Sequence, residues 1–255
     1  MNIIKRFAYN HAIPAIGHLL VGKNELCNVI YYHDIVRDEG YSFMRTNIEV
    51  FKRQMQFIAD NGYETLRFDD LDNPDKMSFR KTRVIIAFDD GWLSNYTEIF
   101  EMMKSMGLKY NVFLAVGLIG EDNRYLTWSM VREMHESGIC GFGTHTYSHV
   151  DLSEITPQVF AQEVKKADER FSSELGYCPK DFCYPFGKYS AESNDYLAEH
   201  SQYERIYLSD LRYSYKFKDK YIMGRNGISN DEAFSVFKAK LNGYFNVLSL
   251  IAKIR

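Results

Sequence analysis

The chain has 255 residues, of which 45% are apolar, so it is long enough to bury a substantial core in one large domain or two small ones. Its formal net charge of -3 comes from acids and bases spread along the chain, and this distribution excludes nucleic acid as the expected partner. The 19 Tyr and 18 Phe fit both a packed core and a groove that faces sugars.

The N-terminal residues 1–26 are predicted to form an amphipathic lead-in that is helical around residues 12–20. Polar residues and Pro14 interrupt its apolar stretch and no clean cleavage site follows, which is not typical of a signal peptide. No window of the chain approaches the ~18 uninterrupted apolar residues that a membrane-spanning helix requires. We therefore expect a cytoplasmic protein.

A strand is predicted at residues 27–32, and it ends in His33. Thr46 and Asn47 can then cap a helix with apolar residues on one face, and a short strand follows at residues 64–67. Strand and helix thus begin to alternate near the start of the chain.

The next strand, at residues 83–88, runs directly into Asp89, Asp90 and Gly91. It is short and rich in β-branched residues, which is typical of a parallel strand covered on both faces. Two carboxylates at its end either cap the next helix or are aimed into a pocket by the turn that Gly91 permits. This stretch alone leaves both interpretations open.

The alternation continues through the rest of the chain. The predicted helices are 92–106, one capped by Thr127, one beginning at Thr156 and Pro157, 190–200, and one capped by Asn230; the predicted strands are 110–116, 139–143, 181–186, 203–208 and 221–223. About seven alternations without a linker or repeat indicate one α/β domain of barrel type at residues 27–243. The apolar and basic tail, residues 244–255, either packs on the barrel or contacts a partner or a membrane surface.

His145 and His149 lie four residues apart, just past a predicted strand. In a barrel, this segment and the pair Asp89 and Asp90 both lie at the C-terminal ends of strands, where barrel active sites are built. One carboxylate and two imidazoles would give a metal three ligands and leave a position open, as catalytic zinc requires. Successive residues cannot easily reach one ion, so the other carboxylate can act as a base.

A third group, Tyr184, Pro185, Phe186 and Gly187, follows the predicted strand at 181–186 and offers aromatic surface at the same rim. We expect it to bind substrate, and an ordinary turn is the alternative. Trp92, which follows the two acids, is a further candidate for substrate binding.

The order Phe-Asp-Asp-Gly, then His-x-x-x-His, then a strand ending in Tyr-Pro-Phe-Gly closely resembles the polysaccharide deacetylase family, also called the NodB homology domain or carbohydrate esterase family 4. The similarity covers about residues 27–228. It implies a distorted (β/α) barrel, which we expect to be seven-stranded, and metal-dependent removal of an N- or O-acyl group from a sugar.

The same resemblance makes Asp89 the general base, and Asp90, His145 and His149 the ligands of one divalent metal, usually zinc, with Co2+, Ni2+ and Fe2+ as alternatives. The early strand before His33 looks like that of the family branch that deacetylates poly-N-acetylglucosamine, in which this strand supplies the acid histidine. His33 is then expected to be the general acid, and a buried structural histidine is the alternative.

The sequence departs from the family pattern in two places. Many members carry Arg-Pro-Pro-Tyr-Gly where this chain has Cys183 in place of the arginine that would hold the catalytic carboxylate, and Arg225 is our candidate to replace it. The late Leu-x-x-His motif is also absent after residue 200, which is why His33 becomes the candidate acid.

As a mechanism, we hypothesise that Asp89 removes a proton from the attacking water and that protonated His33 donates to the departing sugar amine. The backbone N–H of Phe186 or Tyr184 would help to stabilise the oxyanion. The expected substrate carries an N-acetyl amino sugar, in a polysaccharide or in its nucleotide- or lipid-linked precursor. The alternative is a catalytically degenerate barrel that only binds a glycan.

Overall fold

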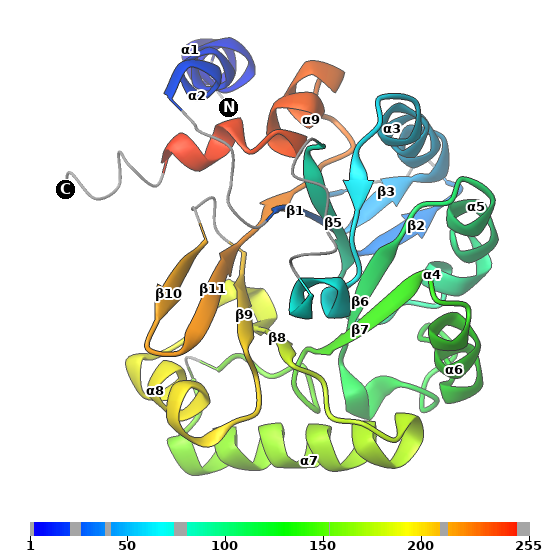
Figure 1. The fold of residues 1–255 in the computed structure, drawn as a ribbon, viewed down its shortest axis with the longest axis vertical. Coiled ribbons are helices and arrows are strands. Elements are labelled where there is room, and N and C mark those ends of the chain that lie inside the picture. The colour runs from blue at the N-terminus through cyan, green and yellow to red at the C-terminus, as the bar shows by residue number, and fades with distance from the viewer. Residues whose placement is uncertain are drawn as a thin grey trace.

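The computed structural model describes residues 3–20, 27–38, 42–73, 81–152, 154–209 and 214–248. At its centre are parallel strands in the order β9, β8, β7, β6, β5, β1, with β11 beside β9 (Figure 1). Their bounds are β1 Asn28–Tyr32, β5 Arg83–Phe88, β6 Tyr110–Leu114, β7 Cys140–Thr144, β8 Asp181–Cys183, β9 Arg205–Leu208 and β11 Lys220–Gly224.

The barrel closes through a strand that is interrupted at Arg225. Before this residue, β11 pairs with β9, with Ile222 opposite Ile206. After it, β12 (Asn226–Gly227) pairs with β1, the strand at the opposite end of the order given above, with Asn226 opposite Ile30. Counting β11 and β12 as one strand, the described residues form seven parallel barrel strands, which confirms the predicted fold. The distortion lies at Arg225, where one strand changes its partner.

Alternate residues of the strands face two different cores. Tyr31, Ala87 and Phe113 belong to a cluster that also takes residues from β8, β9 and β11. Because strands from all around the sheet contribute to it, this cluster fills the barrel interior. Tyr32 and Phe88 point the other way, into a larger cluster shared with the outer helices. The near-continuous apolar runs of these strands follow from burial on both faces.

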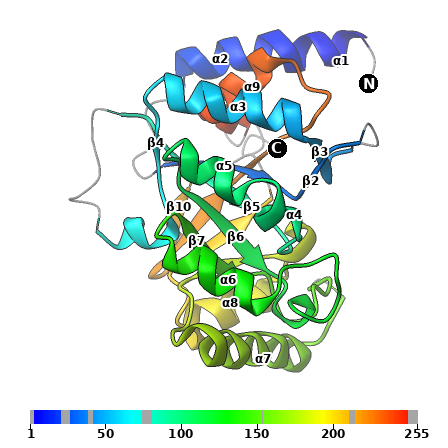
Figure 2. The same cartoon turned by 90° about the vertical axis from the view of Figure 1, so that its right-hand side faces the viewer.

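Helices cover the outside of the barrel, as Figures 1 and 2 show. They are α3 Ile48–Asp60, α4 Ser94–Thr97, α5 Phe100–Ser105, α6 Trp128–Glu136, α7 Pro157–Leu175, α8 Ala191–His200 and α9 Phe234–Leu241. Asn47, Thr127 and Thr156 cap α3, α6 and α7 through their side chains, as the sequence predicts.

Short elements decorate the barrel. They are β2 Asp34–Val36, β3 Arg45–Asn47, β4 Glu64–Thr65, β10 Tyr215–Phe217, the 3-10 turns η2 Phe68–Asp72, η4 Val116–Leu118 and η5 Pro185–Gly187, and η6 Tyr244–Val247. β2 and β3 pair with each other and lie beside α4, on the side of the barrel shown at the right of Figure 2.

Three sequence predictions of secondary structure were wrong in detail. The helix predicted at 92–106 is broken into α4 and α5, with Glu98 and Ile99 between the two helical segments. The strand predicted at 181–186 ends at Cys183, since a 3-10 turn follows. Asn230 does not cap α9; its side chain instead accepts the backbone N–H of Asn47.

The N-terminal segment consists of α1 (Ile3–Phe7), a π-helical turn η1 (Ala8–Ala12) and α2 (Ile13–Leu20). α2 packs on η6 so closely that a Cβ on Gly17 would lie 2.0 Å from the carbonyl oxygen of Tyr244. The tail predicted at 244–255 therefore begins against the lead-in, and its residues 249–255 lie outside the described part of the chain. In that described part, no helix has the length and apolar character to cross a membrane.

Candidate active site

The two carboxylates lie at the C-terminal end of β5, where the chain turns sharply. Asp90 has a φ of 74° and Gly91 a φ of 85°, so two successive residues adopt the left-handed region. A Cβ on Gly91 would lie 2.8 Å from Ile119 Cδ1, so this turn favours glycine. Neither carboxylate caps α4, whose N-cap residue is Leu93. The turn instead sends the side chains of Asp89 and Asp90 to different partners.

Asp89 forms a buried bidentate ion pair with Arg225. Arg225 Nη1 lies 2.6 Å from Asp89 Oδ1, and Nη2 lies 2.9 Å from Oδ2. The remaining guanidinium donors bond to the carbonyl of Leu208 at 3.2 Å and the hydroxyl of Ser209 at 3.0 Å, while the ring of Tyr31 lies 4.1 Å from Arg225 Cζ. Both partners are almost wholly inaccessible, which fixes the orientation of the Asp89 carboxylate.

The pair keeps Asp89 ionised. Burial alone would raise the pKa of Asp89, but the charge and hydrogen bonds of Arg225, together with the neighbouring His145 and His33, outweigh burial and lower the pKa from its usual value. Burial likewise disfavours the charge on Arg225, and the charge and hydrogen bonds of Asp89, with smaller contributions from Cys183 and Tyr31, outweigh burial and raise the pKa of the guanidinium. The result is an oriented carboxylate anion at the end of a barrel strand.

Asp90 meets the two histidines. Its Oδ1 lies 3.6 Å from His145 Nε2 and 3.0 Å from His149 Nε2. This oxygen is buried and accepts no hydrogen bond of standard geometry from the described residues. The other oxygen, Oδ2, accepts the indole N–H of Trp92 at 2.9 Å. One oxygen of Asp90 is thus held by Trp92, while the other lies between two imidazoles. Burial alone would lower the pKa of His149, but its close pairing with Asp90 outweighs burial and raises it, so without a metal a proton is shared between these two residues.

These three residues fit a divalent metal. Two imidazole nitrogens converge on one buried carboxylate oxygen, which is the donor set of a divalent metal site, and a metal ion would replace the proton that otherwise pairs His149 with Asp90. His145 donates from Nδ1 to the carbonyl oxygen of Cys183 at 2.8 Å, which leaves the lone pair of Nε2 facing Asp90. Burial lowers the pKa of His145 to about 4, so its imidazole is neutral, as a metal ligand must be.

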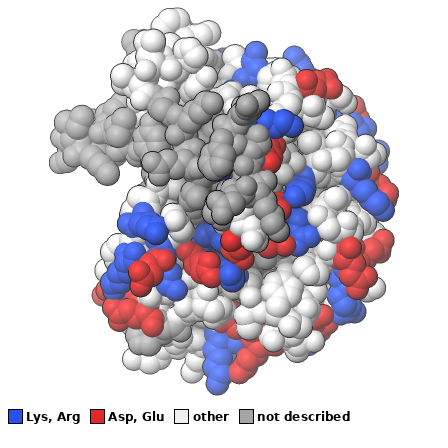
Figure 3. Space-filling view, in the orientation of Figure 1, with Lys and Arg blue, Asp and Glu red and all other residues white. Residues whose placement is uncertain are grey.

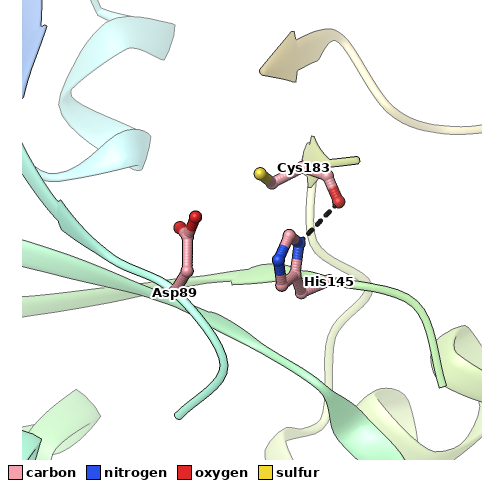
Figure 4. A group of neighbouring side chains, drawn as sticks. All are labelled: Asp89, His145 and Cys183. Atoms are coloured by element: carbon pink, nitrogen blue, oxygen red, sulfur yellow. Dashed lines mark hydrogen bonds between the residues drawn. The ribbon is translucent and has the colours of Figure 1, made fainter. Parts of the chain in front are cut away.

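A second cluster of donor atoms, formed by Asp89, His145 and Cys183, also lies within 4.8 Å (Figure 4). Two observations argue against it as the metal site. Both oxygens of Asp89 are already bonded to Arg225. Burial raises the pKa of the Cys183 thiol well above its usual range, whereas a thiol binds metal as the thiolate. The Asp90 cluster is therefore the better candidate.

His33 follows β1 and reaches the same site. Its Nε2 lies 3.9 Å from Asp89 Oδ2, and its side chain is buried. Its Nδ1 has no hydrogen-bond partner in the described part of the chain. Burial lowers the pKa of His33 from 6.5, so the imidazole is neutral near pH 7 in the free protein. A proton that it donates must therefore reach it during the reaction.

The predicted substrate-binding group is only partly at the surface. Tyr184 is fully buried, its hydroxyl donates to Asn194, and its backbone N–H donates to the carbonyl of Tyr207 at 3.2 Å. The prediction that Tyr184 contacts substrate or supplies an oxyanion donor was therefore wrong, because both of its donors are used within the fold. Pro185 is also buried, which contradicts its predicted contact.

Phe186 is the exposed residue of this group, and Gly187 beside it is half-buried. Phe186 is 61% exposed, has a φ of 58°, and packs its ring against His149 with centroids 4.7 Å apart. Gly187 has a φ of 65°, and a Cβ there would lie 2.7 Å from Ser209 Cβ. The backbone of this group is therefore the turn that we gave as the alternative. The Phe186 ring is the part of it that remains exposed at the rim.

Sequence reasoning missed two contributions to the site. Trp92, predicted to bind substrate, stacks on Tyr125 with centroids 4.8 Å apart and spends its only donor on Asp90. Its position two residues after Asp90 was a usable signal, because a left-handed turn brings such neighbours together. Ser209 accepts a hydrogen bond from Arg225 and packs closely against Gly187, and its sequence context carries no such signal.

Comparison with known proteins identifies the family. A family model described as polysaccharide deacetylase matches residues 76–204, half of the chain. The chain belongs to the polysaccharide deacetylase family. The matched range contains Asp89, Asp90, His145 and His149, whereas His33 and Arg225 lie outside it and are placed by the structure alone.

Relatives and solved structures agree with this family. The Bacillus subtilis (strain 168) protein YxkH, named as a polysaccharide deacetylase, is 30% identical over 65% of this chain and 58% of its own length. A poly-beta-1,6-N-acetyl-D-glucosamine N-deacetylase of Staphylococcus aureus (strain MRSA252) is 20% identical over 94% of this chain and 86% of its own length. The chain thus spans less than two thirds of YxkH.

Two solved structures share the fold. IcaB from Ammonifex degensii matches with a TM-score of 0.73 and 21% identity over 86% of this chain and 98% of its own. The Streptococcus pyogenes deacetylase PplD, solved in complex with acetate, matches with a TM-score of 0.71 and 20% identity over 89% of this chain and 98% of its own. At these identities the similarity supports the barrel fold.

Proposed function

We propose that this polysaccharide deacetylase hydrolyses the N-acetyl group of an amino sugar, in a polysaccharide or in its nucleotide- or lipid-linked precursor. The observation that carries the proposal is the pairing of two adjacent carboxylates with different partners. Asp89 is an oriented base held by Arg225, and Asp90 lies with His145 and His149 in a metal-ligand arrangement. A relative named as a poly-beta-1,6-N-acetyl-D-glucosamine N-deacetylase supports the substrate class.

Asp90, His145 and His149 would hold the metal, for which this ligand set favours Zn2+ and also admits Co2+, Ni2+ or Fe2+. When bound, the metal supplies Lewis acidity toward an acyl carbonyl and toward water. Trp92 keeps the carboxylate of Asp90 turned so that Oδ1 faces the imidazoles.

Asp89 accepts a proton from the water that attacks the acetyl carbonyl. Arg225 holds this carboxylate in one orientation, so the base needs no rearrangement before it reacts. The backbone N–H of Phe186 is the remaining donor of the turn that could face the developing oxyanion, since the Tyr184 N–H is bonded to Tyr207.

His33 completes the proton balance. Because burial keeps it neutral before the reaction, it can take up the proton that Asp89 has removed from water, across the 3.9 Å between the two side chains. It then donates that proton to the sugar nitrogen as the C–N bond breaks, so acetate and a free amine leave together. One proton thus passes from water to Asp89, to His33 and to the amine.

The proposal is tested by paired histidine variants of the full chain. His145→Ala is expected to lose bound metal and acetate release from N-acetylglucosamine oligomers, because a ligand is removed. His135→Ala is the control, since His135 lies in α6 and outside the site. Full metal occupancy in the purified His145→Ala variant would contradict the ligand role. Metal binding by the wild type without acetate release would favour a glycan-binding barrel instead.

A further inference from the structure

The N-terminal segment of α1, η1 and α2 presents large apolar side chains to solvent. Leu19 is 81% exposed and Leu20 is 63% exposed, and Phe7 and Ile16 are exposed as well. Ile16, Leu19 and Leu20 have i, i+3 and i+4 spacing, so they lie on one face of α2. An apolar face of this kind marks a surface at which a protein meets a partner or a membrane.

Another side of the segment is fixed to the C-terminal elements. The hydroxyl of Tyr9 donates to Glu232 at 2.7 Å, and the ring of Tyr9 meets that of Phe245 with centroids 5.0 Å apart. In α2, Gly17 is buried against Tyr244. Figures 1 and 2 show α1 and α2 along one outer edge of the molecule. The fold therefore holds the segment in place by these contacts and leaves its apolar face on the outside.

The segment also differs from the rest of the chain in charge. Residues 1–24 contain Lys5, Arg6 and Lys23 but no Asp or Glu, although the whole chain has 34 acids. Residues 233–255, which include η6 beneath α2, also contain no acid, and their basic residues are Lys238, Lys240, Lys253 and Arg255. The two ends of the chain are thus basic in a protein whose net charge is -3.

This combination of apolar and basic side chains fits a bilayer that contains anionic lipids. The apolar side chains can enter the boundary between headgroups and acyl chains while the cations remain beside lipid phosphates. No helix in the described part of the chain could cross a membrane, so the segment would lie along the surface. A second copy of the chain fits less well, because a symmetric interface here would bring two sets of cations together without an acid from either segment.

We propose that the exposed face of residues 3–20 binds the surface of a membrane that contains anionic lipids. The segment packs on η6 and α9, and the active-site residues belong to other elements, so this surface is separate from the site. The inference does not depend on the proposed chemistry, since it concerns a different surface and needs no metal.

The test is sedimentation of the full chain with vesicles of two kinds, one of phosphatidylcholine alone and one of equal parts phosphatidylcholine and phosphatidylglycerol. We expect binding to the anionic vesicles that weakens as salt is added, because salt screens the lipid charge. Binding to the neutral vesicles should be about tenfold weaker or more. Amide hydrogen exchange of residues 3–20 should slow when anionic vesicles are added, whereas exchange in α7 should not change.

Substitutions in α2 test the apolar face. The double variant Leu19→Gln, Leu20→Gln should bind anionic vesicles about tenfold or more weakly, since two side chains no longer enter the apolar boundary. The double variant Leu19→Met, Leu20→Met keeps apolar side chains and should bind like the wild type. Val159→Gln is the matched control, because Val159 is an exposed apolar residue of α7, which lies at the opposite end of the molecule in Figure 1.

Arg6→Gln tests the contribution of charge. Arg6 is exposed in α1, and its loss should weaken binding to anionic vesicles about fivefold without affecting neutral vesicles. In all of these variants the Tm and acetate release from a soluble N-acetylglucosamine oligomer should stay at wild-type values, because none of the substituted residues belongs to the site. These two controls separate a loss of membrane binding from a loss of folding or of the proposed chemistry.

Three outcomes would overturn the inference. Failure of the wild type to bind anionic vesicles at low salt would show that the face has no affinity for lipid. Equal binding by the wild type and the Leu→Gln double variant would show that another surface makes the contact. Self-association of the wild type without lipid, lost in the Leu→Gln double variant, would assign the face to a second copy of the chain.

Discussion

The barrel contains two buried arginine–aspartate pairs, one at each end, and they differ in their surroundings. At the C-terminal end Arg225 holds Asp89. At the N-terminal end Arg205 holds Asp181 with equally short contacts of 2.7 and 2.8 Å. An ion pair of this kind is therefore not by itself a sign of catalysis, and the neighbouring groups must decide its role.

The lower pair is surrounded by partners. Asp181 also accepts the hydroxyl of Tyr207 at 2.9 Å, and Arg205 also bonds to Asp72 at 2.7 Å, which Lys180 contacts as well. Such a network ties β8, β9 and η2 together and leaves the pair no free acceptor. We infer that it serves the stability of the fold.

The upper pair lies beside groups that the fold does not satisfy. His33 Nδ1 and Asp90 Oδ1 are buried without a hydrogen-bond partner among the described residues. Of the five described non-glycine residues with positive φ, four lie at this end: Asp90, Thr146, His149 and Phe186. Backbone strain gathered beside a candidate metal-ligand cluster distinguishes a site that is built to bind from one that is built to hold.

The charged side chains on the face shown in Figure 3 form no single-sign patch. Figure 3 shows basic and acidic side chains interspersed over the visible surface, without a region of one sign. The buried contacts of the two pairs differ, so substitutions there should separate the two ends.

The largest difference between the two ends of the barrel is expected when the arginines are substituted. Arg225→Met and Arg205→Met each leave a carboxylate buried without its partner, at a cost of roughly 3–5 kcal/mol in the free energy of unfolding. Arg225→Met should in addition lower kcat about 100-fold, because Asp89 loses its fixed orientation. Arg205→Met should leave the kcat of the folded fraction near the wild-type value.

Denaturant titration and acetate release, normalised to the folded fraction, measure both effects. Should either Met variant fail to fold, Arg225→Lys and Arg205→Lys keep the charge and provide the same contrast. Equal kcat losses for the two positions would show that the ends of the barrel do not differ in role.

A smaller effect is expected at Trp92. Trp92→Phe keeps a ring stacked on Tyr125 and removes only the N–H that holds Asp90 Oδ2. Loss of such a supporting hydrogen bond should weaken metal affinity about tenfold. Competition with a chelator of known affinity measures it, and Tyr125→Phe, which keeps the stack, is the control. Unchanged affinity in Trp92→Phe would assign the residue to packing alone.

The smallest effect is expected in the pH profile. Burial lowers the pKa of His33, so the imidazole becomes protonated only as the pH falls below 6.5. If His33 must be neutral to receive the proton from Asp89, kcat/KM stays level from neutral pH downward and falls as the pH drops through this lowered pKa. Metal content measured at each pH excludes ligand loss as the cause.

The opposite profile has a clear meaning. If His33 had to be protonated before the reaction, kcat/KM would fall as the pH rises through its pKa instead. If the wild type shows such a profile and His33→Gln does not, the transfer of one proton from Asp89 to His33 is contradicted. His33 would then act as an acid that is protonated before the reaction.

The sequence predicts much of this end of the barrel. The carboxyl ends of parallel strands meet at one face, so His33, Asp89 and the segment of His145 could be placed together from their positions after predicted strands. The seven-stranded barrel followed from the same alternation. These predictions depend on local patterns, such as an apolar strand followed by polar residues, which can be read directly from the sequence.

The remaining features depend on contacts between distant segments. Arg225 could be named as a candidate partner of Asp89 because the arginine of the family pattern is missing, but its reach could not be predicted. It contacts Asp89 because the closing strand is interrupted at that residue, and no local pattern indicates where a strand changes its partner. The prediction for Tyr184 was wrong for a related reason. β8 ends at Cys183, one residue before Tyr184, and the Tyr184 side chain packs into the hydrophobic cluster beneath α8. Side-chain direction at a strand end is set by tertiary packing, not by the motif.

The account is tested most directly by substituting the two aspartates in parallel. Asp89→Asn should retain bound metal and the folded state but lose acetate release by about 1000-fold or more, because the base is removed. Asp181→Asn should lower the Tm and leave kcat near that of the wild type. Near-normal turnover by metal-loaded Asp89→Asn would contradict the central claim that this carboxylate, held by Arg225, is the base.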